Sequence, residues 1–564
     1  MKTRRALPFL PVLTLIIMIG PVLAGILGAV LPAFGHLPAA GLTGPTLAPF
    51  EALFDWEGLP RAAWLSVSVG LVTTFISLAL VTLITAGWSG TRVHRILERV
   101  LSPLLSVPHA AAAFGFAFLI SPSGWVSRAV SPALTGWERP PDLLIVQDPW
   151  GMSMMAGLIV KEVPFLMLIT LAALGQIDTK RSAAISQALG YGRVTGWLKT
   201  VFPLVYAQMR LPVYVVLAYA MSVVDVAVIL GPNTPPTLSV QIVKWMSDPA
   251  LEMRLQAAAA ALLQLSLVFG ALVFWRFGER IIGRLGTIWI AAGSRGKYDT
   301  IIGVSALSAG VLGVITIALG LAVLAVWSFA GYWGFPDFLP DQFTMRNWDR
   351  HAVGTMSALG ETVIIALTVV LIALVLTIGC LEAEYRYDLR VSSRGLWLLY
   401  LPLLVPQTAF LPGLQTLMLT VGADVGRAPV MFAHLVFVLP YVFLSLADPF
   451  RAWDSRIGTI AAALGAGPDR ILWQVRLPML LRPILTAVAV GIAVSVGQYL
   501  PTLLIGGGRI ETLTTEAVAL ASGGDRRAIG VYALMQTTAA LIPFALALAI
   551  PAVIWRNRRG LRHG

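Results

Sequence analysis

Two segments of the chain share the same order of residue types, and this order indicates how the chain around them is folded. Residues 178–203 read DTKRSAAISQALGYGRVTGWLKTVFP, and residues 454–478 read DSRIGTIAAALGAGPDRILWQVRLP. Each segment starts at an acidic residue and runs through small residues to a glycine. Gly190 and Gly465 stand where a helix commonly ends on a left-handed residue. The pattern therefore predicts a short helix in each segment that stops at its glycine.

A constant spacing shows that the two segments are copies. Ala188-Leu189-Gly190 matches Ala463-Leu464-Gly465 at an offset of 275 residues (465 − 190), and Pro203 matches Pro478 at the same offset. Each proline follows its glycine by thirteen residues (203 − 190). Proline suits the first turn of a helix, where no N–H is needed for an internal bond. We therefore expect the next long helix to begin at each proline.

Long apolar runs surround both segments. The chain has 564 residues, of which 57% are hydrophobic and only 12% are charged. A helix needs about 20 apolar residues to cross a bilayer, and backbone groups in lipid must be satisfied within the segment. The first run is longer than the core of a signal peptide, so we expect a retained helix. Twelve spans are predicted: 6–33, 62–87, 101–120, 151–176, 204–231, 256–276, 301–331, 358–381, 396–421, 428–447, 479–506 and 529–555.

Basic residues orient these spans. They gather at the N-terminus and then in every second connection between runs, while the other connections are mixed or acidic. Cytoplasmic loops carry the excess of Lys and Arg, so both termini and both copied segments are expected in the cytoplasm. The basic groups include Lys2, Arg4 and Arg5, then Arg92, Arg95 and Arg99, and finally Arg556, Arg558, Arg559 and Arg562.

Each copied segment lies between the fourth and fifth run of a set of six. The sequence therefore predicts an all-α polytopic membrane protein with about twelve spans, built as two parallel six-helix repeats. The first unit is residues 1–276, a cytoplasmic linker follows at 277–300, and the second unit is residues 301–564. Residues 121–149 are an extra outer segment of the first unit.

The copied segments resemble the EAA loop of binding-protein-dependent ABC importer permeases, E-A-A-x3-G-x9-I-x-L-P. The glycines fit this pattern, as do Leu477-Pro478 and Phe202-Pro203. The Glu-Ala-Ala does not, because Ala184-Ile185-Ser186 and Thr459-Ile460-Ala461 stand in its place. The departure puts in question any contact made by the family's glutamate.

The resemblance implies the fused permease subunit of an ABC importer, type I in fold, in the bacterial inner membrane. The iron(III)/thiamine-like group is the most similar. Two copies of a cytoplasmic ABC ATPase would dock on the loops, and a periplasmic binding protein would deliver thiamine, iron(III), sulfate, phosphonate or polyamine. The residues implied in coupling are Ala188, Leu189, Gly190, Pro203, Ala463, Leu464, Gly465, Leu477 and Pro478.

Both loops carry basic residues after the glycine. We expect Arg193 and Lys199, and likewise Arg470 and Arg476, to keep each loop in water at the membrane face. Small side chains before the glycine would let a foreign groove approach the helix backbone closely.

No pattern in the chain indicates catalysis, a cofactor or a metal. There is no G-x4-GK[ST] phosphate loop, no HExxH, and a single cysteine, Cys380, so a cysteine metal site is excluded. ATP hydrolysis must then come from another chain. The net charge of +12 does not indicate nucleic-acid binding, because the basic residues are scattered between apolar runs.

A few ionisable residues fall inside predicted spans, where they usually face a cavity or a partner. Lys161 and Glu162 are neighbours in the fourth span and cannot simply pair with each other. With Asp225 and His109 they are candidates for lining the translocation path. The alternative is that each is satisfied by a neighbouring helix or interface.

Two other functions remain open on the sequence. A twelve-helix ion-coupled secondary transporter also has two six-helix halves and would use Asp225 or Lys161-Glu162 as a relay. A membrane enzyme or scaffold is the second alternative. A secondary transporter does not need a glycine-ended helix at the same place in both halves, and the absence of a polar catalytic cluster argues against the enzyme or scaffold.

Overall fold

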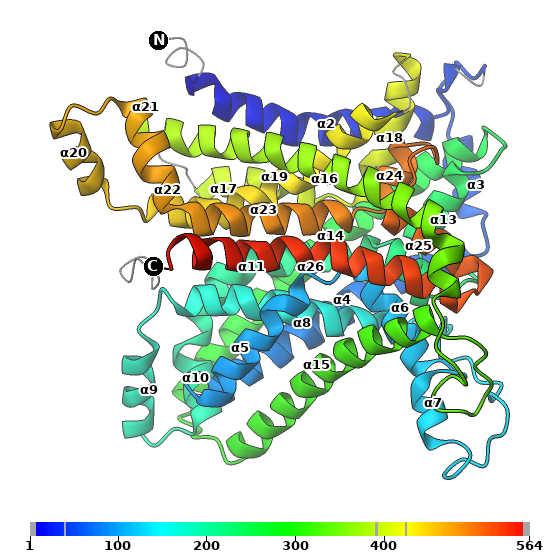
Figure 1. Ribbon diagram of the computed structural model, residues 1–564, viewed down its shortest axis with the longest axis horizontal. Coiled ribbons are helices and arrows are strands. Elements are labelled where there is room, and N and C mark those ends of the chain that lie inside the picture. Colours follow the sequence, from blue (N-terminus) through cyan, green and yellow to red (C-terminus); the bar gives the residue numbers. More distant parts are fainter. Residues whose placement is uncertain (1–6, 39–40, 390–392, 423–425, 557–564) are drawn as a thin grey trace.

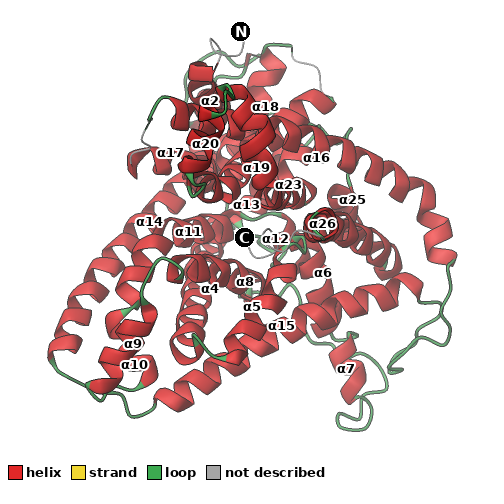
Figure 2. Cartoon of the chain, turned by 60° about the vertical axis from the view of Figure 1, so that its left-hand side comes forward, coloured by secondary structure: helices red, strands yellow, loops and turns green. Residues whose placement is uncertain are grey.

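The apolar runs fold as long helices that satisfy their own backbone hydrogen bonds, as lipid requires. The computed structural model describes residues 7–38, 41–389, 393–422 and 426–556. Within these ranges all regular structure is helical apart from two isolated bridges (Figure 2). Lys2, Arg4 and Arg5, and Arg558, Arg559 and Arg562, which supported the orientation, lie outside the described residues.

The helices follow the predicted order (Figure 1). In the N-terminal half they are α2 (Leu10–Ala33), α3 (Ala48–Phe54), α4 (Leu59–Trp88), α5 (Arg92–Leu105), α6 (His109–Ile120), α7 (Trp125–Val130), α8 (Met152–Leu174), α9 (Thr179–Ala188), α10 (Arg193–Thr200), α11 (Phe202–Ser222), α12 (Asp225–Leu230), α13 (Leu238–Met246) and α14 (Met253–Ala291).

The C-terminal half continues in the same way. It comprises α15 (Asp299–Phe329), α16 (Arg346–Arg386), α17 (Ser393–Leu404), α18 (Gln407–Thr420), α19 (Arg427–Arg451), α20 (Ser455–Ala463), α21 (Pro468–Ile471), the π-helical turn η3 (Leu472–Arg476), α22 (Leu477–Met479), α23 (Leu481–Val496), α24 (Leu500–Ile505), α25 (Leu513–Ala519) and α26 (Arg526–Ile554).

The number of spans agrees with the prediction. Ten described helices are long and apolar enough to cross a bilayer, and there are twelve if each of two bent pairs is one span. The bends are 84° between α17 and α18, and 75° between Pro468–Met479 and α23. Both bends coincide with prolines or their neighbours, which interrupt the helical hydrogen bonds.

Several predicted boundaries were wrong. The third run does not begin at 101, because residues 101–105 are the end of α5 and the chain turns at Val107-Pro108 before α6 begins at His109. The fifth run is broken between α11 and α12. The linker predicted at 277–300 is largely helical, since α14 continues to Ala291. Arg276, Arg280 and Arg284 are compatible with a helix that leaves the membrane without stopping.

The two halves interlock through their first long helices. Helix α2 packs along α18 of the other half, and α15 packs along α6. Glycines allow both crossings: a Cβ on Gly25 would overlap the carbonyl of Phe410, and a Cβ on Gly115 would lie 2.7 Å from the carbonyl carbon of Gly320. Small residues at such crossings let helices approach closely in lipid. The halves are therefore packed closely against each other along these two crossings.

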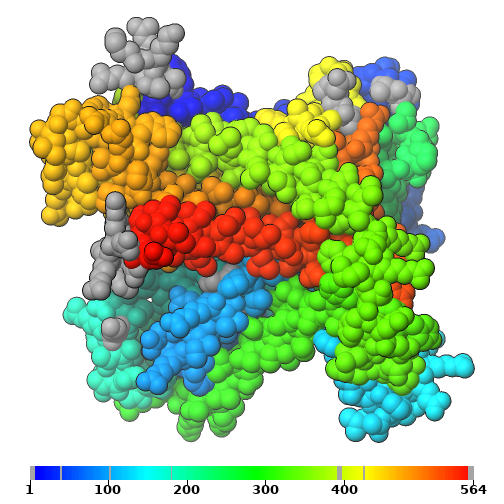
Figure 3. Space-filling model, in the orientation of Figure 1, coloured from blue at the N-terminus to red at the C-terminus, as the bar shows by residue number. Residues whose placement is uncertain are grey.

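The copied helices project from one end of the molecule. Helices α9 and α20 both lie at the left of Figure 1, where α2 begins and α26 ends, whereas α7 lies at the opposite end. The space-filling view shows the α20 region in orange and the α9 region in cyan-green protruding separately at this end (Figure 3).

The extra segment 121–149 is anchored to the C-terminal half. The indole of Trp125 donates to the carbonyl of Phe338 (2.9 Å), and its ring stacks on that phenyl ring. The Arg128 guanidinium donates to the carbonyls of Gly334 and Asp337 and lies over the ring of Trp333. This segment thus joins the two halves at the end opposite α9 and α20.

Candidate functional site

The two loop helices, α9 and α20, are built alike. Asp178 caps α9 by accepting from the N–H of Arg181 (3.1 Å), and Asp454 caps α20 by accepting from the N–H of Arg456 (3.0 Å). Short polar side chains at this position satisfy the free N–H groups of the first turn. The acidic residue that opens each copied segment is therefore a helix cap.

Both loop helices end as the sequence predicts. Gly190 has φ +78° and Gly465 has φ +85°, the left-handed region that only glycine adopts without strain. The chain then closes in the same way, with the Tyr191 N–H donating to the Ser186 carbonyl and the Ala466 N–H to the Ala461 carbonyl, each at 3.0 Å. This pattern is the Schellman end of a helix.

Each loop helix exposes a pair of large apolar side chains one turn apart. Ile185 and Leu189 are 52% and 58% exposed, and Ile460 and Leu464 are 62% and 84% exposed. The pairs occupy matching positions, again 275 residues apart. Ala188 and Ala463 are exposed beside them. Residues four apart lie on one face of a helix, so each loop presents a small apolar ridge. Apolar residues four apart are visible in the sequence of each segment, but the sequence does not show whether they face a core or the solvent. The structure shows that they face the solvent.

The first loop is tied to the linker between the halves. The Lys199 ammonium donates to the carbonyls of Trp289 (3.1 Å) and Ser294 (2.8 Å) near the end of α14. The Asp299 carboxylate accepts from the N–H and the hydroxyl of Thr195, both at 2.7 Å. Since Asp299 begins α15, the first loop is joined directly to the first long helix of the other half.

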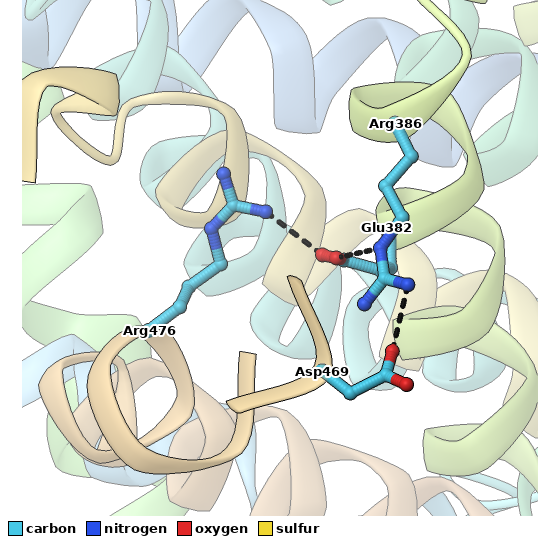
Figure 4. A network of polar contacts seen from close by, with 4 residues as sticks. All are labelled: Glu382, Arg386, Asp469 and Arg476. Carbon is cyan, nitrogen blue, oxygen red and sulfur yellow. Dashed lines mark hydrogen bonds and ion pairs between the residues drawn. The ribbon is translucent and has the colours of Figure 1, made fainter. Parts of the chain in front are cut away.

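The second loop is tied instead to α16 of its own half (Figure 4). Arg476 donates to Glu382 (Nη1–Oε2, 2.9 Å), and Arg386 bridges Glu382 (2.6 Å) and Asp469 (2.7 Å). The Arg476 guanidinium also lies 3.7 Å from the ring centre of Tyr385 and close to Trp453 and Phe450. The loop therefore has a buried ionic and aromatic anchor.

These contacts correct one prediction. Arg193 and Arg470 are exposed as expected, but Lys199 and Arg476 are buried. Lys199 finds carbonyl groups at a helix end, which favour a cation, and Arg476 finds a carboxylate and aromatic faces. The basic residues thus anchor the loops as well as keeping them at the surface.

The prolines behave differently in the two copies. Pro203 lies in the first turn of α11, as predicted. Leu477 and Pro478 lie in the one-turn helix α22, and the long helix α23 begins only at Leu481 after a bend. The prediction for Pro478 was wrong, because η3 runs on directly into α22 and carries the chain past the proline.

The structure separates Lys161 from Glu162. The Lys161 ammonium donates to the carbonyls of Leu104 and Leu105 (both 2.9 Å), the last residues of α5. The Glu162 carboxylate points to another partner, His109, with 3.5 Å between Oε1 and Nε2. Lys161 thus caps a helix end, as the alternative of satisfaction by a neighbouring helix predicted.

Asp225 lies where the fifth span breaks. It is the first residue of α12, after α11 ends at Ser222, and it is 7% exposed. The C-terminal half has a similar break, since α23 ends at Val496 and α24 begins at Leu500. Asp225 is buried beside this break and not at the surface of the molecule.

Among the described residues, no group of three or more His, Cys, Asp or Glu side chains could hold a metal ion. Cys380 is buried, and its thiol donates to the hydroxyl of Thr14 (3.1 Å).

Comparison with known proteins decides the family. No family model matches the chain. The chain is 32% identical over 555 residues to the inner membrane ABC transporter permease protein YnjC of Escherichia coli (strain K12), covering 97% of this chain and 98% of that protein. The chain belongs to the ABC transporter permeases.

Shorter permeases match only part of the chain. It is 24% identical over 251 residues to the putative 2-aminoethylphosphonate transport system permease protein PhnV of Salmonella typhimurium, covering 44% of this chain but 93% of PhnV. It is 25% identical over 168 residues to the spermidine/putrescine transport system permease protein PotC of Haemophilus influenzae, covering 30% of this chain and 63% of PotC. An almost complete permease thus fits within half of this one, which is a fused two-unit ABC importer permease.

Proposed function

We propose that this permease couples two copies of a cytoplasmic ATPase to solute import through the loop helices α9 and α20. A periplasmic binding protein would deliver the solute at the opposite end, near α7. The permease units are residues 1–276 and 301–564, joined by the linker 277–300. Both termini then lie in the cytoplasm, at the end from which α9 and α20 project.

The duplicated apolar ridges carry this proposal. The pairs Ile185/Leu189 and Ile460/Leu464 are exposed at the cytoplasmic end, where apolar side chains gain nothing from lipid. Exposed apolar patches on helices mark sites of protein contact. The family's glutamate is missing from both loops, so docking would depend on these four side chains and on the shape set by Gly190 and Gly465.

The solute would pass between the two halves. We place the path beside Glu162, Asp225 and His109, and we assign Lys161 a structural role at the end of α5. The solute classes expected from the resemblance are thiamine, iron(III), sulfate, phosphonate and polyamine, in a transporter like the iron(III)/thiamine group. PotC and PhnV are named for a polyamine and an aminophosphonate, which fall within two of these classes.

The double substitution Leu189→Asp/Leu464→Asp is expected to detach the ATPase. Burying a leucine at an interface contributes about 1.5–3 kcal/mol, and each aspartate would instead have to lose its water. The measurement is copurification of the ATPase with the permease from membranes, together with uptake of the transported solute. Both should fall to background while the amount of permease in the membrane is unchanged.

The matched control is Gln187→Asp/Ala462→Asp. These residues are exposed on the same two helices, and they lie two positions from each leucine, on the opposite face. The control adds the same charges and should retain the ATPase. Equal retention by both double variants would show that the ridges are not the docking surface.

A further inference from the structure

The last part of α14 reaches beyond the span and is held at two points. The 39 residues of α14 extend about 58 Å at 1.5 Å per residue, whereas the hydrocarbon core of a bilayer is about 30 Å thick. The Glu279 carboxylate accepts from the Tyr206 hydroxyl of α11 (2.6 Å), and the Trp289 carbonyl accepts from the Lys199 ammonium of α10 (3.1 Å). Figure 2 shows this part of α14 at the edge of the molecule, beside α9 and α10. We call residues 277–291 the α14 extension.

The α14 extension presents an apolar stripe that the chain leaves uncovered. Residues three or four positions apart lie on one face of a helix, and four large apolar side chains follow this spacing. They are between 41% and 65% exposed: Phe277, Ile281, Leu285 and Ile288. A Cβ added at Gly283 or Gly286 would meet no atom within 4 Å, so the helix is open on other sides as well. A contiguous apolar surface of this kind indicates a partner that covers it.

Two arginines beside the stripe carry unpaired charge. Arg280 and Arg284 follow Phe277 and Ile281 by three residues, so they lie next to these side chains on the helix surface. Both are exposed, and within the described residues their side chains form no hydrogen bond or ion pair. The arginines around the second loop differ, since each pairs with a carboxylate: Arg386, Arg451 and Arg476. The charge of the α14 extension is therefore available to an anionic partner.

We propose that the α14 extension binds anionic phospholipid at the membrane surface, on the side of the membrane where α9 and α20 project. The apolar stripe would enter the boundary between headgroups and acyl chains, and Arg280 and Arg284 would reach the lipid phosphates. The extension continues a membrane span without a break, so it starts at this surface. A second copy of the chain on the same stripe would instead bring unpaired arginines together.

Lipid bound here would also fix the position of the first loop. The N–H of Gly192 donates to the Arg295 carbonyl (2.8 Å), and the Lys199 ammonium donates to the Ser294 carbonyl (2.8 Å). Both acceptors lie just after the α14 extension. The loop that carries α9 thus rests on a segment whose own position would be set by the lipid.

The first test measures how deeply each face of the extension lies. Cys380→Ser removes the only cysteine, and Leu285→Cys or Gly283→Cys then carries a single fluorescent probe. The two positions are two residues apart and face nearly opposite directions. With the full chain in phosphatidylcholine nanodiscs, lipid with brominated acyl chains should quench the probe at 285 strongly and the probe at 283 weakly.

The second test measures the preference for anionic lipid. Short-chain phosphatidylglycerol is titrated into the permease in zwitterionic detergent, and the probe at 285 reports binding. Arg280→Gln/Arg284→Gln should weaken this binding about 25-fold, because each arginine at an anionic surface contributes about fivefold. Short-chain phosphatidylcholine should bind with the same affinity before and after the substitution.

The matched control is Arg456→Gln/Arg470→Gln. It removes the same two charges from exposed positions of the second loop and should leave the affinity for phosphatidylglycerol unchanged. Three results would overturn the proposal: equal quenching at both positions, weak quenching at 285 in a chain that elutes as a dimer or as a monomer, or equal affinities of the two double variants. ATPase attachment is measured separately through Leu189 and Leu464, so the two proposals fail independently.

Discussion

Gly465→Pro is expected to abolish solute uptake while the permease remains folded in the membrane. Gly465 has φ +85°, and proline is fixed near −65°. The substitution also removes the N–H that donates to the Ala462 carbonyl (2.9 Å). No atom lies within 4 Å of a Cβ at this position, so the effect is on the backbone alone. The end of α20 must then rearrange, and Leu464 moves with it.

Three measurements separate loss of coupling from loss of folding. The amount of permease in the membrane should be normal, uptake should fall to background, and the remaining ATPase activity should no longer respond to the binding protein. Normal ATP-driven uptake by Gly465→Pro would contradict the assignment of α20 as a coupling helix.

Gly467→Pro is the matched control for this experiment. It makes the same substitution two residues away, at a glycine with φ −71° that a proline ring accepts. A Cβ there meets no atom within 4 Å either. This variant should keep most of its uptake, because the backbone at this N-cap position already has the φ that proline requires. Gly465→Ala should be intermediate, since a left-handed alanine costs about 1–2 kcal/mol.

Local patterns in the sequence were sufficient to predict the spans and the ends of the loop helices α9 and α20. The apolar runs predicted the number of spans, since each long helix must satisfy its own hydrogen bonds in lipid. The glycines at 190 and 465 predicted where α9 and α20 end, because no other residue adopts that conformation freely. These features depend on neighbours in the chain, which is why one sequence reveals them.

Features that depend on distant residues could not be predicted. Nothing near Lys199 indicates that its ammonium reaches the end of α14, ninety residues later in the chain. The crossing of Gly25 with α18 and that of Gly115 with α15 likewise join positions that are remote in sequence. Helix breaks such as the one before Asp225 follow from packing between halves, and the apolar run of residues around them gives no sign of an interruption.

The two anchors give the loops different connections. The first loop is bonded to α15, which packs on α6 and α26, so its movement acts on both halves. The second loop is bonded to α16 of its own half. An identical ATPase on each loop would then act on different membrane helices, α15 for the first loop and α16 for the second. The contact between the second loop and α16 can be tested through one residue, Arg476.

Arg476→Met is expected to destabilise the permease strongly. Arg476 is 3% exposed and pairs with Glu382, which is equally buried. Stranding a buried charge costs about 3–5 kcal/mol, and Glu382 keeps one of its two partners, Arg386, so the loss of this ion pair should cost less than that. The contacts with Tyr385, Phe450 and Trp453 are lost as well. The melting temperature of the purified permease should fall, and uptake should fall with it.

Two further variants identify the cause. Arg470→Met makes the same change six residues earlier, where the side chain is exposed and bonds only Gln474 among the described residues; its melting temperature should match that of the unaltered chain. Adding Glu382→Gln to Arg476→Met removes the carboxylate that has lost one of its two partners, while Arg386 keeps its bond to Asp469, and a buried pair replaced by neutral groups is often tolerated. The double variant should therefore recover much of the lost stability. If Arg476→Met melts like Arg470→Met, the buried pair does not hold the second loop, and force from α20 must reach the membrane helices through α22 and α23 alone.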